Sequence, residues 1–258
     1  MVARHFALAL VAGFISATAA AQSGNAMLDK ATATSAASPS LSPELRGDIF
    51  MARRMYREAI ETYRSAPSGD AVVRNKIGIA FHQLNDLESA RKAYQQALKI
   101  KPDYSEVMNN IGAVYYARKS YRRAVAWYEK ALKQDSASAR AASYYMNLGT
   151  AWFARKNFDK GMENYQTALK LDPEVLEHHG SFGQVLEERS IAERASYHFH
   201  IARLYAKQGR NELALQYLRK ALEEGYKDKK ELEKEPDFAN LRDLPEFKDL
   251  LALEPRVL

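Results

Sequence analysis

The sequence predicts an all-α solenoid in which short helical hairpins stack on one another. Two observations carry this prediction. A pattern of glycine, alanine and aromatic residues recurs every 34 residues, and each copy holds two amphipathic helical stretches separated by a polar turn. The composition agrees, since 47% of the 258 residues are apolar and 27% are charged, as in a folded globular chain. One hairpin cannot bury its apolar face alone, so the copies must stack.

The clearest copies of the pattern are residues 71–104, 105–138 and 142–175. In each copy a glycine is followed by a tyrosine and then by an alanine at the same spacings. The matching triplets are Gly78, Tyr94 and Ala97; Gly112, Tyr128 and Ala131; and Gly149, Tyr165 and Ala168. Small residues are expected where the two helices of a hairpin cross closely, and the aromatic rings then fill the volume between them.

Polar turns and prolines predict where individual helices begin and end. In the first clear copy, Asn85 and Glu88 have the spacing of a capping box, which would make Asn85 the N-cap of the second helix. Pro102 and Pro173 end their copies because proline cannot continue a helix. We therefore expect two helices in each copy, separated by a polar turn.

Weaker copies extend the repeat in both directions. Residues 41–70 form a shortened copy, and residues 195–225 form a further one. Residues 174–194 interrupt the period and make an insertion longer than the usual connection between helices. Residues 226–258 are predicted to cap the last hairpin, because a terminal repeat needs a polar outer face.

The N-terminal residues 1–21 have the layout of a cleavable signal peptide. Arg4 precedes the apolar run Phe6–Ile15, and small residues follow up to Ala21. We expect cleavage there and export to the periplasm or exterior of a bacterium, with no transmembrane segment left. The alternative is a retained anchor, although the run is far shorter than the ~20 residues of a spanning helix. Residues 22–40, rich in Ser, Ala and Thr, are predicted to be a flexible tether.

The composition also excludes several classes of function. The chain has no cysteine, which rules out a disulfide framework, thiolate metal sites and cysteine nucleophiles. It has no G-x-S-x-G, H-E-x-x-H, G-x-G-x-x-G or Walker motif, so we predict a non-catalytic protein without a cofactor. The net charge of +6 permits acidic partners. Nucleic acid is not an expected partner of an exported protein.

The 34-residue pattern closely resembles the tetratricopeptide repeat family, whose signature has the same order of glycine, aromatic, alanine and proline residues. The resemblance covers residues 41–225, and residues 226–258 resemble the segment that closes the repeat group in some bacterial members. It implies a right-handed superhelical solenoid whose first helices line a concave groove. It also implies a scaffold or adaptor that holds a protein or peptide segment in that groove.

The same resemblance assigns candidate residues to the groove, taken from positions of the first helices outside the helix-packing core. Asparagines directly before Ile-Gly and Leu-Gly are typical of a ladder of amides that contacts a peptide backbone. The candidate peptide-binding residues are Asn75, His82, Asn109, Asn110, Tyr116, Met146, Asn147 and Phe153.

Two alternative functions stay open. The first is an accessory or catalytic site in the insertion 174–194, where His178, His179, His198 and His200 lie in or beside it. Imidazole is a common metal ligand, but these spacings do not place two histidines on one helix face, and we predict no metal site.

The second alternative is a surface that binds an anionic envelope polymer or lipid. Arg118, Lys119, Arg122 and Arg123 form a basic cluster in the turn of the second clear copy. Such a cluster attracts polyanions, although a charged turn of this kind is also typical of an ordinary solvated surface.

Overall fold

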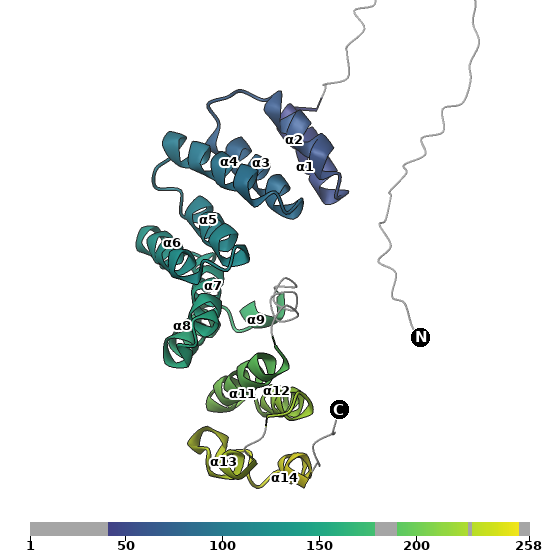
Figure 1. Ribbon diagram of the computed structural model, residues 1–258, viewed down its shortest axis with the longest axis vertical. Coiled ribbons are helices and arrows are strands. Elements are labelled where there is room, and N and C mark those ends of the chain that lie inside the picture. Colours follow the sequence, from purple (N-terminus) through teal and green to yellow (C-terminus); the bar gives the residue numbers. More distant parts are fainter. Residues whose placement is uncertain (1–40, 179–189, 227–228, 253–258) are drawn as a thin grey trace, which may run out of the picture. The chain divides into compact units, whose positions relative to one another are not determined.

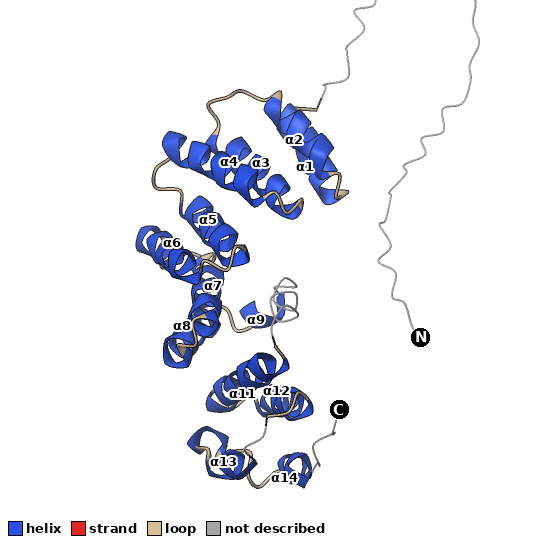
Figure 2. Ribbon diagram, in the orientation of Figure 1, coloured by secondary structure: helices blue, strands red, loops and turns tan. Residues whose placement is uncertain are grey.

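The computed structural model describes residues 41–178, 190–226 and 229–252. The chain divides into two units, Met1–Ser40 and Leu41–Leu258, and the described residues belong to the second. The expected signal peptide (1–21) and tether (22–40) lie outside the described residues, as does most of the insertion. All elements in the described ranges are helices, with no strand among them (Figure 2).

Ten of these helices form five consecutive hairpins (Figure 1). The short helix α9 (Val175–His178) follows the fourth hairpin, and α13 (Lys229–Lys234), the 3-10 helix η1 (Pro236–Phe238) and α14 (Pro245–Ala252) follow the fifth. The hairpins are α1 (Pro43–Ala52) with α2 (Tyr56–Arg64), α3 (Ala71–Gln83) with α4 (Leu87–Ile100), α5 (Ser105–Ala117) with α6 (Tyr121–Gln134), α7 (Ala141–Ala154) with α8 (Phe158–Leu171), and α11 (Ile191–Lys207) with α12 (Asn211–Glu223).

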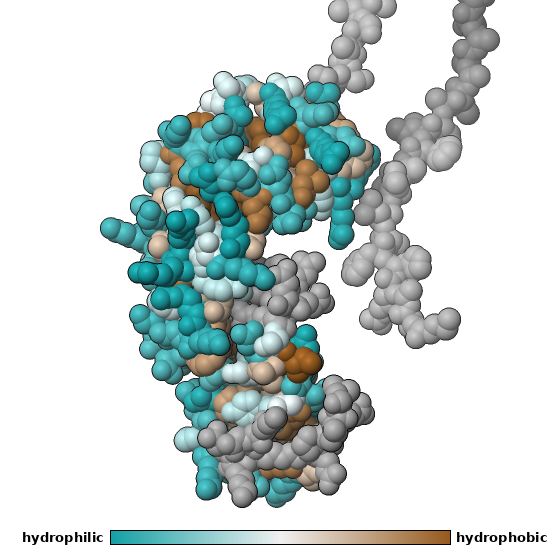
Figure 3. Space-filling model, in the orientation of Figure 1, coloured by the Kyte–Doolittle hydropathy of each residue, from teal (hydrophilic) through white to brown (hydrophobic). Residues whose placement is uncertain are grey.

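The hairpins pack in chain order. Each first helix packs against its own second helix, and the second helix then contacts the first helix of the next hairpin. This arrangement confirms the predicted all-helical fold of stacked helix pairs. Apolar side chains gather over α1–α4 on the face shown in Figure 3. Within the described residues, no helix is long and apolar enough to span a membrane.

A glycine on the first helix meets a tyrosine ring on the second in four hairpins. A Cβ atom added at Gly78 would lie 2.4 Å from Tyr94 Cε1, and one at Gly112 would lie 2.5 Å from Tyr128 Cε1. Gly47 and Gly149 face Tyr63 and Tyr165 in the same way. No side chain fits between these helices, so the predicted small residue is a steric requirement of the crossing.

The turn inside each hairpin holds one residue in the left-handed conformation at the same repeat position. These residues are Arg54, Asn85, Lys119, Lys156 and Gly209, with φ between 56° and 71°. The predicted capping box at Asn85 is therefore wrong. Asn85 belongs to the turn, and Asp86 is the N-cap, accepting a hydrogen bond from the backbone N–H of Ser89. A capping box does form in α11, between Ser190 and Glu193.

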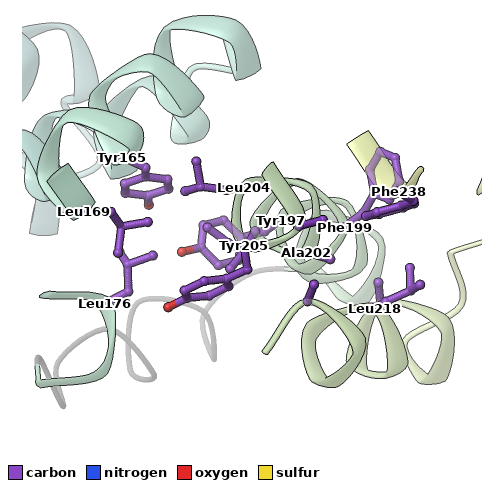
Figure 4. Close-up of a cluster of buried hydrophobic side chains, with 14 of the residues drawn as sticks. Tyr165, Leu169, Leu176, Tyr197, Phe199, Ala202, Leu204, Tyr205, Leu218 and Phe238 are labelled. Carbon is purple, nitrogen blue, oxygen red and sulfur yellow. The ribbon is translucent and has the colours of Figure 1, made fainter. Parts of the chain in front are cut away.

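The largest buried cluster joins the fourth and fifth hairpins and the C-terminal helices. Tyrosine and leucine side chains of α8, α9 and α11 face one another, and aromatic residues of α11 and η1 continue the cluster on the other side of α11 (Figure 4). The labelled members are Tyr165, Leu169, Leu176, Tyr197, Phe199, Ala202, Leu204, Tyr205, Leu218 and Phe238. The C-terminal segment is thus packed against the last hairpin.

Charged contacts tie this segment to α11. Arg203 Nη2 lies 2.8 Å from Asp237 Oδ2, and its Nε lies 3.3 Å from a carboxylate oxygen of Glu235. Asn240 donates a hydrogen bond to the backbone oxygen of Ala206. Phe238 and Phe247 are buried beside these contacts.

Replacing Gly78 by alanine tests the steric requirement. The methyl group would overlap the buried ring of Tyr94, so we expect Gly78→Ala to lower the free energy of unfolding by about 1–3 kcal/mol. Gly69→Ala is the matched control, because no atom lies within 4 Å of a Cβ at Gly69 and we expect no loss there. Urea unfolding of both variants measures the difference, and equal stability would contradict the packing argument.

Candidate functional site

Four asparagines connect consecutive first helices, and we call them the amide ladder: Asn75, Asn109, Asn110 and Asn147. Asn110 Nδ2 donates to Asn75 Oδ1 over 2.9 Å, joining α5 to α3. Asn147 Nδ2 donates to Asn109 Oδ1 over 2.9 Å, joining α7 to α5. In both rungs the donor stands two residues before the hairpin glycine, and the acceptor stands three residues before the glycine of the preceding hairpin. The repeat itself therefore builds the ladder.

A charged rung continues the ladder to α1. Lys76 has the position of Asn110 and Asn147, and its Nζ lies 2.6 Å from Glu44 Oε1 and 2.8 Å from Asp48 Oδ2. Asp48 also accepts a hydrogen bond from Tyr63 Oη. Partial burial opposes ionisation of Asp48, but the hydrogen bonds from Lys76 and Tyr63 lower its pKa. The positive charge of Lys76 is thus balanced within the protein.

The asparagines of the amide ladder differ in how many hydrogen bonds their side-chain amides already make within the protein. Asn75 is 2% exposed, and its Nδ2 also donates to Glu106 Oε1 over 2.8 Å. Asn109, Asn110 and Asn147 are only partly buried. Among the described residues, Asn109 Nδ2 and the Oδ1 atoms of Asn110 and Asn147 have no hydrogen-bond partner. One free donor and two free acceptors therefore remain on α5 and α7.

The other predicted groove residues fall into two pairs. His82 of α3 and Tyr116 of α5 are partly buried, and the Tyr116 ring lies 5.2 Å from the ring of Tyr121. Met146 and Phe153 of α7 are each 3% exposed and belong to the core shared with α11. The accessible part of the predicted groove is therefore carried by α3, α5 and the amide of Asn147.

The burial of Phe153 has a local cause. Gly161 of α8 stands where the other four hairpins carry alanine, and a Cβ there would lie 2.4 Å from Phe153 Cδ2. The ring stacks on Tyr165, with centroids 5.2 Å apart, and meets the edge of Tyr197 on α11 at 5.2 Å. Phe153 therefore turns into the helix-packing core, which the sequence pattern alone did not predict.

The amide ladder does not continue into the fifth hairpin, where His200 holds the position equivalent to Asn147. His200 stands two residues before Ala202, as Asn147 stands two residues before Gly149, but Met146 offers it no amide acceptor. Its ring stacks on Phe158 with centroids 4.8 Å apart, and its Nδ1 is buried without a hydrogen-bond partner in the described residues. Burial, and then the charge of Arg203, lower its pKa to about 4.

The neighbouring His198 makes a different contact. Its Nδ1 lies 2.7 Å from Glu224 Oε2, while Arg194 Nε lies 3.0 Å from Glu224 Oε1, so three charged or polar groups tie α11 to the end of α12. Burial lowers the pKa of His198 against the opposing effect of Glu224. The side chains of His178 and His179 lie outside the described residues. In the part of the chain that is described, no three histidine, aspartate or glutamate side chains converge as metal ligands would.

Comparison with known families explains this geometry. A family model described as TPR repeat matches residues 78–118, and models described as tetratricopeptide repeat match residues 106–133, 142–175 and 195–224. This chain is a tetratricopeptide-repeat protein. Tetratricopeptide repeats are typically non-catalytic scaffolds for contacts between proteins, and their stacked helices offer extended concave surfaces.

Solved structures share the tetratricopeptide fold of this chain at low sequence identity. A structure of Pseudomonas aeruginosa pilF is 20% identical in sequence, with a TM-score of 0.54, and the match covers 81% of this chain and 86% of that one. MamA 41-end from Desulfovibrio magneticus RS-1 is 23% identical, with a TM-score of 0.48 over 76% and 95% of the two chains. At these identities the likeness concerns the fold alone.

A curated relative matches part of this chain. It is the uncharacterized protein ycf37 of Guillardia theta, which is 30% identical over 97 residues. The match spans 34% of this chain and about half (54%) of that relative. It adds no activity or ligand.

The ladder's buried member is expected to matter most for stability. Asn75→Ala would remove the hydrogen bonds that Asn75 makes with Glu106 and Asn110. Among the described residues Glu106 would keep only its ion pair with Arg140, and we expect the change to cost about 2–3 kcal/mol of unfolding free energy. Asn147→Ala removes one bond at a partly exposed site, and we expect a cost of about 1 kcal/mol or less. Urea unfolding of the two variants compares them, and an equal or larger effect at Asn147 would contradict this ranking.

His200 is expected to make the tetratricopeptide domain sensitive to acid. Its pKa is lowered on folding from the ordinary 6.5 to about 4, so the unfolded chain binds more protons between these values. The stability contribution is complete above pH 6.5 and is lost as the pH falls towards 4, by at most about 3 kcal/mol. His200→Phe keeps the stacking on Phe158 without the titrating group, and we expect it to lose less stability between pH 7 and pH 4 than the wild type. Urea midpoints at both pH values measure this, and parallel losses would contradict it.

Proposed function

We propose that this protein is a non-catalytic scaffold that holds a peptide segment of a partner protein against α3, α5 and α7. One observation carries the proposal: Asn109, Asn110 and Asn147 are partly exposed on neighbouring first helices, and each keeps one half of its amide unused. A peptide backbone presents N–H donors and C=O acceptors, which these free groups would satisfy.

The chemistry around the amide ladder favours an uncharged segment. Two carboxylates, Glu44 and Asp48, pair with the single positive charge of Lys76, so this group offers no unpaired cation to a ligand. Burial lowers the pKa of His82, so its imidazole is neutral at pH 7. Tyr116 adds an aromatic surface on α5 without a formal charge. A ligand held by backbone hydrogen bonds and apolar contacts fits these surroundings better than an acidic or basic peptide does.

The cell envelope is the proposed compartment. The leader supports this, since the apolar run Phe6–Ile15 and the small residues up to Ala21 have the order of an export signal. The lack of cysteine is compatible with it, because the stacked hairpins bury their core without disulfides. A partner in the envelope is accordingly the proposed ligand.

A cross-linking experiment with paired variants tests the groove. Asn109→Ala/Tyr116→Ala changes the proposed contact surface of α5. Asn164→Ala/Tyr121→Ala is the matched control, because it removes the same residue types from second helices and also breaks the Tyr116–Tyr121 ring contact. Proteins cross-linked to each variant in native cells are recovered and quantified by mass spectrometry.

We expect recovery of the specific partner to fall about tenfold or more for the groove variant and to be retained by the control, because central aromatic residues dominate peptide binding. Thermal unfolding of both variants checks that they are folded. Equal recovery with the wild type and the groove variant would exclude binding at this surface.

A further inference from the structure

The turns inside the first four hairpins form a surface that we call the turn edge: residues 53–57, 84–88, 118–122 and 155–159. Its cations lie in the first, third and fourth turns, whereas the second turn carries Asp86 and Glu88. The turns are equivalent, because each holds its left-handed residue at the same position. The second and third turns also touch, since Arg118 Nη1 lies 3.3 Å from Glu88 Oε2 in the preceding hairpin. The turn edge therefore runs along one side of the stacked hairpins.

The charge of the turn edge is strongly unbalanced. It contains eight basic and three acidic residues. Two of the three acids are engaged, because Asp86 caps α4 and Glu88 pairs with Arg91 and Arg118. All eight basic side chains are exposed, and among the described residues only Arg118 has a carboxylate partner. The eight are Arg53, Arg54, Arg57, Arg118, Lys119, Arg122, Arg155 and Lys156.

Two apolar side chains are exposed on the turn edge: Met55 lies among the cations of the first turn, and Leu84 lies in the second turn, which has no cation of its own. Met55 is 36% exposed and Leu84 is 37% exposed, and both lie at the tips of turns. Neither belongs to the buried clusters of its hairpin. Over α6 and α8, hydrophilic side chains cover the surface (Figure 3). Exposed apolar residues flanked by cations are typical of surfaces that enter the headgroup layer of a membrane.

We propose that the turn edge docks on a membrane surface that contains anionic phospholipids. The cations would lie among the phosphate groups, and Met55 and Leu84 would reach the boundary of the acyl chains. Several equivalent turn tips can contact the flat membrane surface at the same time. Their individually weak contacts then add up to a higher overall affinity. This role goes beyond the peptide scaffold and uses none of the residues of the amide ladder.

The apolar tips distinguish a membrane from a linear polyanion. A polymer such as polyphosphate would be attracted by the same cations, but it offers no apolar phase into which Met55 and Leu84 could be transferred. A membrane containing anionic lipid can interact with both the cations and the apolar residues of the turn edge. Vesicle binding should therefore depend on the cations and on the apolar residues, whereas polymer binding should depend on the cations alone.

Vesicle binding by the full chain tests the role of the cations. The turn variant is Lys119→Asn/Arg122→Gln/Lys156→Asn, in which asparagine suits the left-handed turn positions. The control variant, Lys99→Gln/Lys133→Gln/Lys170→Gln, removes the same charge from exposed lysines in the last turns of α4, α6 and α8. Affinities are measured for phosphatidylcholine vesicles with and without phosphatidylglycerol.

We expect the turn variant to bind the phosphatidylglycerol vesicles about 100-fold more weakly than the wild type, and the control variant to bind much more tightly than the turn variant. Any affinity of the apolar leader for lipid is the same in all three proteins, so it cancels in the comparison. Equal binding by the turn variant and the control variant would overturn the proposal.

A second pair of measurements separates the membrane from a polymer. Met55→Ser/Leu84→Ser keeps every cation, and we expect it to weaken vesicle binding while its binding to polyphosphate stays unchanged. If this variant binds vesicles as tightly as the wild type while remaining folded by circular dichroism, the turn edge is only a polyanion surface and the membrane proposal fails.

Discussion

Four of the five hairpins depend on one contact, in which the edge of a tyrosine ring on the second helix lies against the backbone of a glycine on the first. At Gly78 there is no room for a side chain, because a Cβ atom would overlap the Tyr94 ring at a distance of 2.4 Å. This contact fixes the distance and rotation between the two helices. It consequently fixes which residues of the first helix face the neighbouring hairpins. The residue two positions before the glycine contacts the preceding hairpin, and the residue three positions before it contacts the following one. The hydrogen bonds between asparagines of neighbouring hairpins therefore depend on the contact between glycine and tyrosine within each hairpin.

The fourth hairpin shows what happens when one part of this geometry changes. Gly161 opens space on α8, and Phe153 fills it and continues into contact with Tyr197 of α11. Met146 then stands where earlier hairpins have an amide or carboxylate acceptor. The rungs consequently stop, and the fifth hairpin is joined by aromatic and apolar packing. A backbone-binding surface made of amides can therefore extend only across α3, α5 and α7.

The sequence was sufficient to predict contacts between residues that lie in the same hairpin at a fixed separation within the repeat. Gly78 and Tyr94 belong to one hairpin, so their contact can be read from the repeat. Part of the burial of Phe153 comes from Gly161 in its own hairpin. The rest could not be predicted, because the contact with Tyr197 depends on α11, which follows an insertion without repeat character. Asn85 was mistaken for a cap because Asn85 and Asp86 both suit that role, and only the backbone shows that Asn85 holds the left-handed turn position. His200 could be found only by extending the ladder register into the degenerate fifth copy.

The two surfaces of the repeats differ in charge because they use different parts of the first helix. Ladder residues such as Asn109 lie before the hairpin glycine, where neighbouring helices are close and an unbalanced charge would be desolvated. The turn residues, such as Lys119, lie after the helix ends and keep their water. Cations therefore accumulate in the turns at little cost in stability, while Lys76, the one cation in the ladder, requires two carboxylates. The same repeat can thus present a neutral surface to a peptide and a basic edge to an anionic layer, and neither surface needs residues of the other.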